Sequence, residues 1–441
     1  MAEKTYYTAV VGAGPAGLFA ARELARSGVT VVIFNRDIKP GGLAEYGIYP
    51  DKYAMKDGLR NQFNQVLETP GIRYFGNISV GAQADLSLDD LRELGFQAIL
   101  VTVGAQGTKW LGLPGEHLKG VYHAKDLVYH YNQLPPFTDR EFVFGKKVAV
   151  VGAGNVMLDI SRFLIQKVKV DEVFAVVRRG PAEVKFDKKE MEYIIHNLDQ
   201  RALDAEMERV ADTMKAIGQD PVAAKAQILE ALPRAQPSNS TTRFGFQFLM
   251  SPTRILGDEH VSGLELEDNS LVLKDGDVKA RGLGSSHTLD VDAVVFAIGD
   301  RVDASFGLPL AGNEFARNPS PRFPQEGISF EPYDPVSQAP IPGVFVAGWA
   351  RQASHGLVGY ARKDGTLGAR AVLGYLQTLE KIEPDDEALT RTLKKTGKVL
   401  VDQNDLRKLD EIETEVAHRR DLPSFKFGTN EEMLEKIMSV G

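Results

Sequence analysis

The sequence has no cysteine among its 441 residues. This absence excludes structural disulfides, cysteine-ligated iron–sulfur clusters, thiolate zinc sites and a CxxC redox pair on this chain. No uninterrupted apolar run approaches the roughly 18 residues of a membrane span. We expect a cytoplasmic location, with no signal peptide before the strand-like segment that begins by Tyr7. A targeting segment that was cleaved earlier stays open as an alternative.

The sequence also lacks an excess of basic residues. It has 52 Lys and Arg against 60 Asp and Glu, so the formal net charge is −8. That balance argues against a nucleic-acid binder, which usually carries a basic excess. The hydrophobic share of 43% and the charged share of 25% are typical of a globular protein, and the length allows two or three domains.

A glycine turn follows the first expected strand. The stretch "YTAVVGAGPAGLFAARELARSG" predicts strand, turn and helix, and "VTVVIF" predicts a second strand. In such a turn Gly12 bends the chain, Gly14 lets the backbone approach a pyrophosphate, and Gly17, after Ala16, lets the helix pack on the strand. The context predicts a dinucleotide site; the alternative is a glycine turn in a plain α/β protein.

The second strand ends at Asn35, where an acidic residue is expected to bind the ribose hydroxyls. An asparagine amide donates and accepts hydrogen bonds but cannot make a charge-assisted one. We therefore expect a weakened ribose contact at Asn35. An ordinary turn residue is the alternative.

A second unit repeats this pattern about 140 residues later. "KKVAVVGAGNVMLDISRFLIQ" predicts strand, turn and helix, and "VFAVV" predicts the following strand. Gly152 and Gly154 correspond to Gly12 and Gly14, and we place Leu158 at the position of the third glycine. Each unit should form a parallel sheet with right-handed crossovers. The fold class is therefore α/β, with two Rossmann-like three-layer dinucleotide-binding domains.

The second repeat differs from the first at the end of its second strand. Arg178 and Arg179 stand there, at the place that Asn35 has in the first repeat. An arginine at this position accommodates the 2′-phosphate of NADP, which NAD lacks. The alternatives are a solvated strand end and a salt bridge with Glu183. Two dinucleotide modules, one selective for NADP, indicate a flavoenzyme with FAD at the first module.

With these motifs, the chain resembles the adrenodoxin reductase-like family of FAD-dependent ferredoxin–NADP reductases, which is related to glutamate synthase small-subunit flavoproteins. The resemblance runs along nearly the whole chain, including "GGLAEYGIYPDKYAMK", "VAVVGAGNVMLDISRFL", "VVRRGPAEVKFDKKEMEYI" and "VFVAGWARQASHGLVGYARKDGTLGARAVL". It implies an NADP domain inserted into an FAD domain. The strands that end at Gly104 and Gly299 mark the two crossings. We expect FAD-domain parts at 1–105 and 301–441, and an NADP domain at 106–300 with a helical insertion at about 188–236.

The resemblance also implies roles for single residues. Asn155 and Val156 should meet the NADP pyrophosphate, and Glu190 should lie near the nicotinamide, where the alternative is a solvated helix residue. Asp159 should lie near the flavin in a proton or hydrogen-bond network, where the alternative is a surface aspartate. The residues expected around the flavin or its nicotinamide side are Gly42, Leu43, Gly47, Ile48, Gly104, Gly348, Trp349, Gly356, Leu357 and Val358. The alternative for Trp349 is that its side chain only packs in the core or at an interface.

The implied activity is hydride transfer between NADP(H) and FAD, followed by one-electron transfer to or from a ferredoxin-type iron–sulfur protein. The partner should bind transiently, on basic residues between Lys167 and Lys189, and a homodimer is possible. Two alternatives stay open: a flavoprotein subunit of a larger redox complex, and a non-catalytic FAD- and NADP-binding redox sensor. The lack of cysteine argues against a disulfide reductase.

Overall fold

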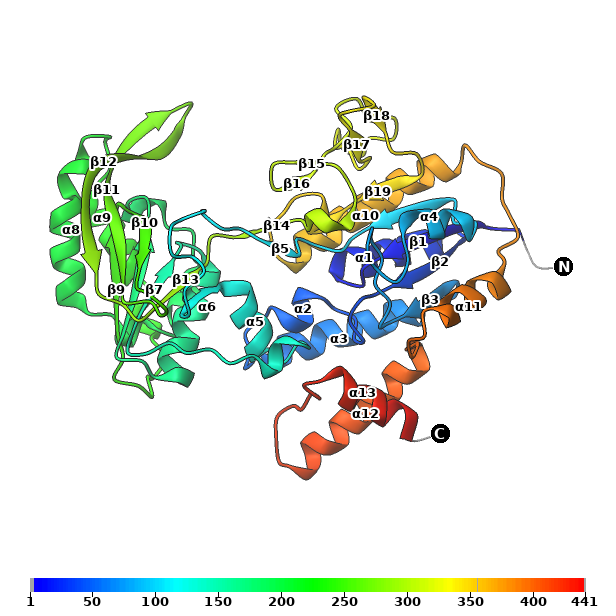
Figure 1. Ribbon diagram of the computed structural model, residues 1–441, viewed down its shortest axis with the longest axis horizontal. Coiled ribbons are helices and arrows are strands. Elements are labelled where there is room, and N and C mark those ends of the chain that lie inside the picture. The colour runs from blue at the N-terminus through cyan, green and yellow to red at the C-terminus, as the bar shows by residue number, and fades with distance from the viewer. Residues whose placement is uncertain (1–3, 355, 440–441) are drawn as a thin grey trace. The chain divides into compact units, whose positions relative to one another are not determined.

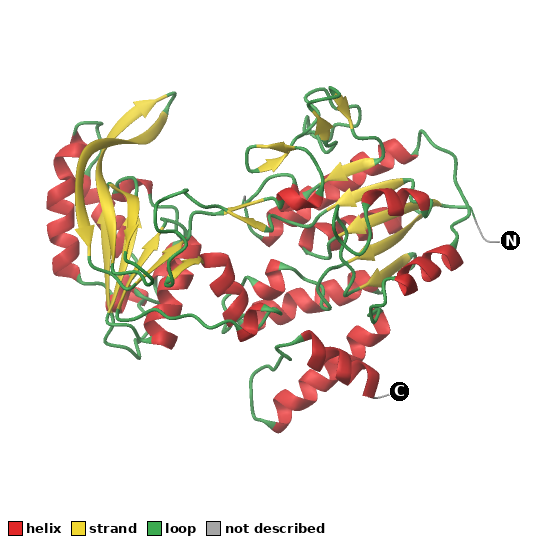
Figure 2. Ribbon diagram, viewed as in Figure 1, coloured by secondary structure: helices red, strands yellow, loops and turns green. Residues whose placement is uncertain are grey.

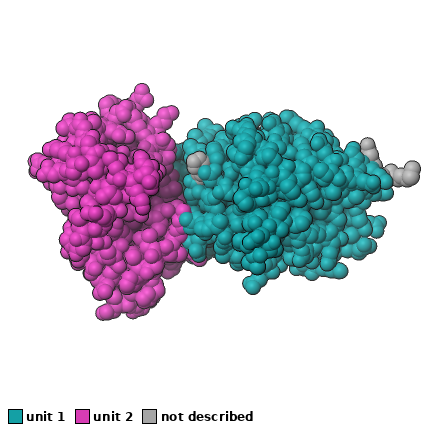
Figure 3. Space-filling view, turned by 90° about the horizontal axis from the view of Figure 1, so that it is seen from above, with its two compact units in different colours: residues 1–108, 129–139, 300–441 teal, residues 109–128, 140–299 magenta. Residues whose placement is uncertain are grey.

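The computed structural model describes residues 4–354 and 356–439. The chain divides into two compact units, coloured separately in Figure 3: unit 1 comprises residues 1–108, 129–139 and 300–441, and unit 2 comprises residues 109–128 and 140–299. The expected ranges 1–105, 106–300 and 301–441 approximate this division. They differ in that residues 106–108, 129–139 and 300 belong to unit 1.

Unit 1 is built on a parallel sheet of five strands in the order β19-β4-β1-β2-β3 (Figure 1). Alternate residues of the central strand enter opposite cores. Val10 packs with α1, α3 and α10 residues, whereas Ala9 and Val11 pack with residues of α4 and α11. The larger elements are β1 (Tyr6–Val11), α1 (Pro15–Arg26), β2 (Val29–Phe34), α2 (Leu43–Tyr46), α3 (Tyr53–Leu67), β3 (Ile72–Phe75), α4 (Leu88–Glu93), β4 (Ala98–Val101), β19 (Val344–Val346), α10 (Val358–Leu376), α11 (Asp386–Lys395), α12 (Gln403–Arg419) and α13 (Asn430–Ser439).

Short elements complete unit 1. The chain crosses between the units next to β5 and next to β14, and these two strands pair with each other in an antiparallel ladder. These elements are β5 (Gly107–Thr108), η1 (Phe137–Asp139), β14 (Asp300–Arg301), η6 (Ala304–Phe306), β15 (Leu310–Ala311), β16 (Glu314–Phe315), β17 (Tyr333–Asp334), β18 (Ala339–Pro340) and η7 (Gly348–Ala350).

The C-terminal tail, the residues after Glu380, contributes to the core of unit 1. Leu406 and Leu409 of α12 and Met433 and Ile437 of α13 are buried in the same cluster as α1 and β1 residues. The amphipathic spacing of these residues on their helices explains the burial.

Unit 2 repeats the sheet of unit 1 with the order β6-β13-β7-β8-β9, all parallel. A separate antiparallel sheet, β10-β11-β12, adds to it, and the expected helical insertion holds α7, α8 and α9 (Figure 2). The elements are β6 (Val121–His123), α5 (Ala124–Tyr131), β7 (Lys147–Val151), α6 (Asn155–Phe163), η2 (Leu164–Val168), β8 (Glu172–Val177), η3 (Pro181–Glu183), α7 (Lys188–Met191), η4 (Ile195–Asn197), α8 (Gln200–Lys215), α9 (Pro221–Leu229), η5 (Leu232–Arg234), β9 (Arg243–Phe248), β10 (Met250–Leu256), β11 (Gly263–Lys274), β12 (Asp277–Leu289) and β13 (Ala293–Phe296).

The predicted α/β class with parallel sheets is confirmed by these two units. Among the described residues, no helix has the length and apolar character that a membrane crossing requires.

Candidate functional site

The glycine turn of unit 1 connects β1 to α1, and its three glycines differ in their surroundings. A Cβ on Gly12, whose φ is +101°, would lie 2.8 Å from the Thr102 carbonyl oxygen. A Cβ on Gly17 would lie 2.0 Å from the Gly12 carbonyl oxygen. A Cβ on Gly14 would meet no heavy atom within 4 Å. Gly12 and Gly17 therefore allow close backbone contact, whereas Gly14 leaves open space at the N-terminus of α1.

Thr102, just after β4, supports this turn and was missed by the sequence reasoning. Its hydroxyl donates to the carbonyl oxygens of Val11 and Gly12, at 3.0 and 2.8 Å. Its N–H donates to the Val11 carbonyl at 2.8 Å. The available signal was a lone hydroxyl residue inside the apolar run "AILVTV".

Asn35 lies at the end of β2, as expected, but its amide is bonded inside the protein. Its Oδ1 accepts from the Ala13 N–H at 3.0 Å, so it ties β2 to the glycine turn. Its Nδ2 donates to the carbonyl oxygens of Asp37 and Lys39 at 2.8 and 3.1 Å. These bonds favour the structural role of a turn residue, and the ribose contact stays a prediction.

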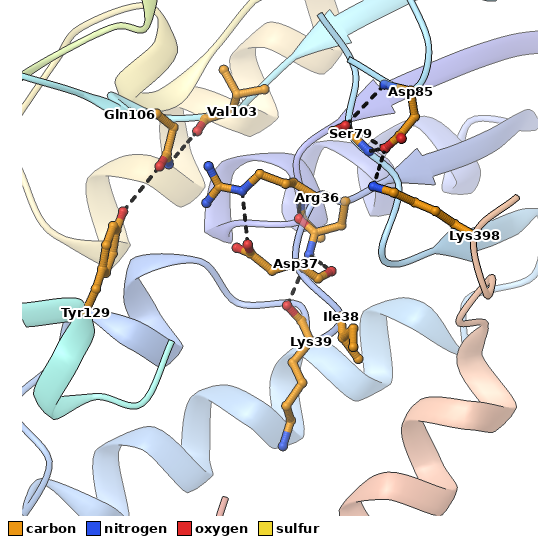
Figure 4. Close-up of polar contacts among 12 residues, drawn as sticks. Arg36, Asp37, Ile38, Lys39, Ser79, Asp85, Val103, Gln106, Tyr129 and Lys398 are labelled. Atoms are coloured by element: carbon orange, nitrogen blue, oxygen red, sulfur yellow. Dashed lines mark hydrogen bonds and ion pairs between the residues drawn. The ribbon is translucent and has the colours of Figure 1, made fainter. Parts of the chain in front are cut away.

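Gln106 and Tyr129 lie on the β4 side of the same region (Figure 4). The Gln106 amide donates to the Val103 carbonyl at 2.9 Å, and the Tyr129 hydroxyl donates to Gln106 Oε1 at 3.3 Å. Gly104, at φ +73°, lies within this stretch. These bonds attach the 129–139 segment to the strand end that carries Gly104.

The loop of residues 41–48 packs against the glycine turn. The Gly41 N–H donates to the Ala13 carbonyl at 2.8 Å. A Cβ on Gly42 would lie 3.2 Å from Gly14 Cα, and Gly42 has a φ of +50°. Leu43 begins α2, and Gly47 follows its end, immediately before Ile48. The structure therefore brings Gly42 to Gly14, as the two motifs required.

The C-terminal motif reaches the same turn from the other end of the chain. A Cβ on Gly348 would lie 2.6 Å from the Ala16 Cβ. The buried carboxylate of Asp364 accepts from the Gly348 N–H at 2.6 Å and forms an ion pair with Arg351. Trp349 follows Gly348 in η7 and is half-buried.

The residues expected after Trp349 lead into α10. Gly356 has a φ of +71°, and Leu357 is the N-cap of α10, with 74% of its surface exposed. Val358 is the first residue of that helix. Residue 355 lies outside the described residues.

The glycine turn of unit 2 repeats the spatial pattern of unit 1. A Cβ on Gly152 would lie 2.5 Å from the Ala297 carbonyl oxygen, whereas a Cβ on Gly154 would meet nothing within 4 Å. The residue at the third position is Met157 and not Leu158, since Gly17 follows Gly14 by three residues and Met157 follows Gly154 by three. Met157 is fully buried. The open side at the second glycine is thus common to both turns.

Asn155, at the start of α6, is held by the loop after β8. Its Nδ2 donates to Asp187 Oδ2, and its Oδ1 accepts from the Asp187 N–H, both at 2.7 Å. Val156 is 45% exposed beside it. Asp159, further along α6, and Glu190, in α7, are both partly buried.

The arginine pair follows β8, and hydrogen bonds hold its backbone carbonyls. The Arg178 carbonyl accepts from Asn269 Nδ2 at 3.0 Å, and the Arg179 carbonyl accepts from the Leu249 N–H at 3.1 Å. Arg178 is exposed and Arg179 half-buried, and neither has an ion pair within the part of the chain that the structure describes.

Glu183 is hydrogen-bonded to residues other than the two arginines. It accepts a hydrogen bond from the Gly180 N–H at 2.9 Å and one from the Gln219 amide. The alternative of an Arg–Glu183 salt bridge is therefore not the arrangement found. Neither guanidinium group is neutralised by an ion pair with a described residue, so both can bind an anion.

Comparison with known proteins agrees with this geometry. The family model described as "Pyridine nucleotide-disulphide oxidoreductase" matches residues 6–232, just over half of the chain. The chain belongs to the pyridine nucleotide-disulphide oxidoreductase family. As a member without cysteine, it has no redox disulfide of its own.

Individual relatives match most or nearly all of the chain. NADPH:adrenodoxin oxidoreductase of Salvelinus fontinalis is 28% identical over 97% of this chain and 90% of its own length. NADPH-ferredoxin reductase FprA of Mycobacterium leprae is 29% identical over 81% of each chain. The solved structure of Mycobacterium tuberculosis FprA in complex with NADPH has a TM-score of 0.80 and 26% identity, and the match covers 99% of this chain and 100% of that one. The expected resemblance to adrenodoxin reductase-like proteins is confirmed.

Proposed function

We propose that this protein is an FAD-dependent NADPH–ferredoxin reductase. One observation carries the proposal: the chain holds two glycine turns of the same build, and only the second is followed by an arginine pair. Both turns leave space at the helix N-terminus, where a pyrophosphate binds in such folds. The printed functions of the adrenodoxin and FprA relatives support the same activity.

The residues of unit 1 fit FAD. The open side of Gly14 accommodates a pyrophosphate, and Gly42 and Gly348 lie against the same turn. We assign Gly12, Gly14, Ala16, Gly17, Gly42, Leu43, Gly47, Ile48, Gly104, Gly348, Trp349, Gly356, Leu357 and Val358 to this cofactor, with Asn35 holding the turn. When bound, FAD exchanges a hydride with NADP(H) and single electrons with an iron–sulfur protein.

The residues of unit 2 fit NADP(H). Gly152 and Gly154 form the turn before α6, and Asn155 and Val156 begin that helix. Two guanidinium groups without an ion pair in the described chain suit the 2′-phosphate. We assign Arg178 and Arg179 to that phosphate. Asp159 and Glu190 stay candidates for proton transfer and nicotinamide orientation.

The work of this chain is binding and orientation, since hydride transfer needs no protein nucleophile. The glycine turns set the depth at which each pyrophosphate can approach, and buried bonds such as Asp364 to Gly348 fix the backbone around the turn in unit 1. A transient iron–sulfur partner follows from the one-electron chemistry. The cytoplasmic location, the docking residues between Lys167 and Lys189, and a homodimer stay predictions.

The test is anaerobic reduction of cytochrome c by NADPH, with and without an added ferredoxin. We expect the rate to depend strongly on ferredoxin. If NADPH bleaches the flavin but ferredoxin adds nothing, the acceptor is another protein, as in a subunit of a larger redox complex. If NADPH does not bleach bound FAD, the reductase assignment is wrong.

A further inference from the structure

A cluster of buried charges joins distant segments of unit 1. Glu45, on α2, is 3% exposed, and its carboxylate accepts two hydrogen bonds from the Arg60 guanidinium, at 2.7 Å each. Lys426, in the C-terminal tail, makes a second ion pair with Glu45 at 3.0 Å. Next to them, Lys39 is ion-paired with Glu413 of α12, and both are buried. We call these five residues the tail cluster.

Lys56 and Asn132 connect the tail cluster to two more segments. The Lys56 ammonium donates to the Glu45 carbonyl oxygen at 3.1 Å and to Asn132 Oδ1 at 2.6 Å. Lys426 also donates to the Asn132 carbonyl oxygen at 2.7 Å. Residues from α2, α3, the 129–139 segment and the tail therefore share one hydrogen-bond network.

The network is strongly coupled because its charges are buried together. Burial alone would raise the pKa of the Glu45 carboxyl, but the hydrogen bonds from Arg60 and the charges of Lys426 and Arg60 outweigh it and hold this pKa far below its usual range. Removing one partner of a buried ion pair is destabilising, and loss of Lys426 would leave Glu45 only its ion pair with Arg60. Loss of Lys426 would thus disturb the position of Glu45.

Glu45 is linked to the nucleotide-binding turn by a short path. The Glu45 N–H donates to the Gly42 carbonyl at 3.0 Å, and the Gly41 N–H donates to the Ala13 carbonyl at 2.8 Å. Gly42 in turn lies against Gly14. A shift of Glu45 therefore moves the 41–48 loop relative to the glycine turn.

We propose that the C-terminal tail positions the 41–48 loop for FAD, with Lys426 and Glu413 as positioning residues that hold Glu45 and Lys39. This inference rests on the proposed function, because it takes the space at Gly14 as the FAD pyrophosphate site. It adds to that function a determinant of FAD affinity that lies far along the chain from every cofactor motif.

The experiment measures FAD binding by the full-length apoprotein, through quenching of flavin fluorescence, for the variants Lys426→Met and Glu413→Gln. The matched control is Lys398→Met, which removes an ion pair between the tail region and Asp85, outside the tail cluster. Binding of NADP+ to the same samples checks folding of unit 2. The double variant Glu45→Gln/Lys426→Met tests whether Lys426 acts through Glu45.

We expect Lys426→Met and Glu413→Gln to raise the dissociation constant of FAD by about 5- to 150-fold, the usual range of coupling between two sites. Lys398→Met should leave it unchanged, and the double variant should be no weaker than Lys426→Met alone. Unchanged FAD binding by both cluster variants would overturn the proposal, as would strictly additive effects in the double variant. Failure of the unsubstituted protein to bind FAD would instead overturn the proposed function.

Discussion

Among single residues, we expect Arg178 and Arg179 to set the choice between NADPH and NADH. Their backbone is fixed by Asn269 and Leu249, and their side chains are free of ion pairs in the described chain. Replacing both by alanine should lower kcat/KM for NADPH by about 10- to 100-fold, since a hydrogen bond to a charged group contributes about 1.5–3 kcal/mol. The kcat/KM for NADH should change little. Steady-state kinetics with both nucleotides check this, and equal losses would contradict the assignment.

The glycines at positions 14 and 17 offer a matched pair of substitutions. Gly17→Ala forces a methyl group to 2.0 Å from the Gly12 carbonyl oxygen, so it should destabilise the apoprotein by about 1–3 kcal/mol. Gly14→Ala meets no atom within 4 Å and has an extended backbone, so the apoprotein should keep its stability within about 1 kcal/mol.

The same pair separates folding from binding. The Gly14→Ala methyl occupies the side on which the pyrophosphate approaches, so FAD affinity should fall by about tenfold or more. Urea unfolding of the apoproteins and FAD titration provide the two measurements. An unstable Gly14→Ala protein, or one that binds FAD normally, would contradict the assignment of the open side of Gly14 to the pyrophosphate.

Among the elements, those set by local pattern could be predicted from sequence. The strands and helices around both glycine turns, the helical insertion and the cofactor motifs depend on short-range spacing and were found. The tail cluster could not be predicted, because a buried polar contact between Glu45 and Lys426 leaves no periodic signal in either segment. Thr102 was missed because its hydrogen bonds join segments that are far apart in the sequence. The assignment of residues 129–139 to unit 1 also depends on contacts between distant segments, because Tyr129 and Leu134 pack with Tyr46.

The burial of Lys56, in α3, gives unit 1 a specific pH dependence. Burial lowers the pKa of Lys56 from 10.5 to about 7, and the charge of Lys426 acts in the same direction. Between those two values the unfolded chain binds the proton and the folded chain does not. The free energy of unfolding should therefore rise with pH across this window, by up to about 1.4 kcal/mol per pH unit from this group.

Lys56→Met removes that contribution. Urea unfolding at pH 7, 8 and 9 should show a smaller increase for Lys56→Met than for the unsubstituted protein, while Lys398→Met should follow the unsubstituted protein. Parallel curves for all three proteins would mean that Lys56 titrates normally.

At the scale of the whole molecule, the repeat extends from motif to sheet. The orders β19-β4-β1-β2-β3 and β6-β13-β7-β8-β9 place a glycine turn after the central strand of each unit. Each unit also has a hydrophobic core of its own. The two units thus share one sheet arrangement, and we expect the residues at the end of the strand beside each turn to distinguish the two nucleotides.

Separate cores predict separate responses to the two nucleotides. A ligand that binds only the folded state stabilises it by about 2.7 kcal/mol at a concentration 100 times its dissociation constant. In calorimetry of the apoprotein, FAD should raise the unfolding temperature of unit 1, and NADP+ should raise that of unit 2. The Arg178→Ala/Arg179→Ala variant should lose the NADP+ shift and keep the FAD shift. A single transition that both ligands raise equally would instead show that the two units unfold as one, so that each nucleotide stabilises the site of the other.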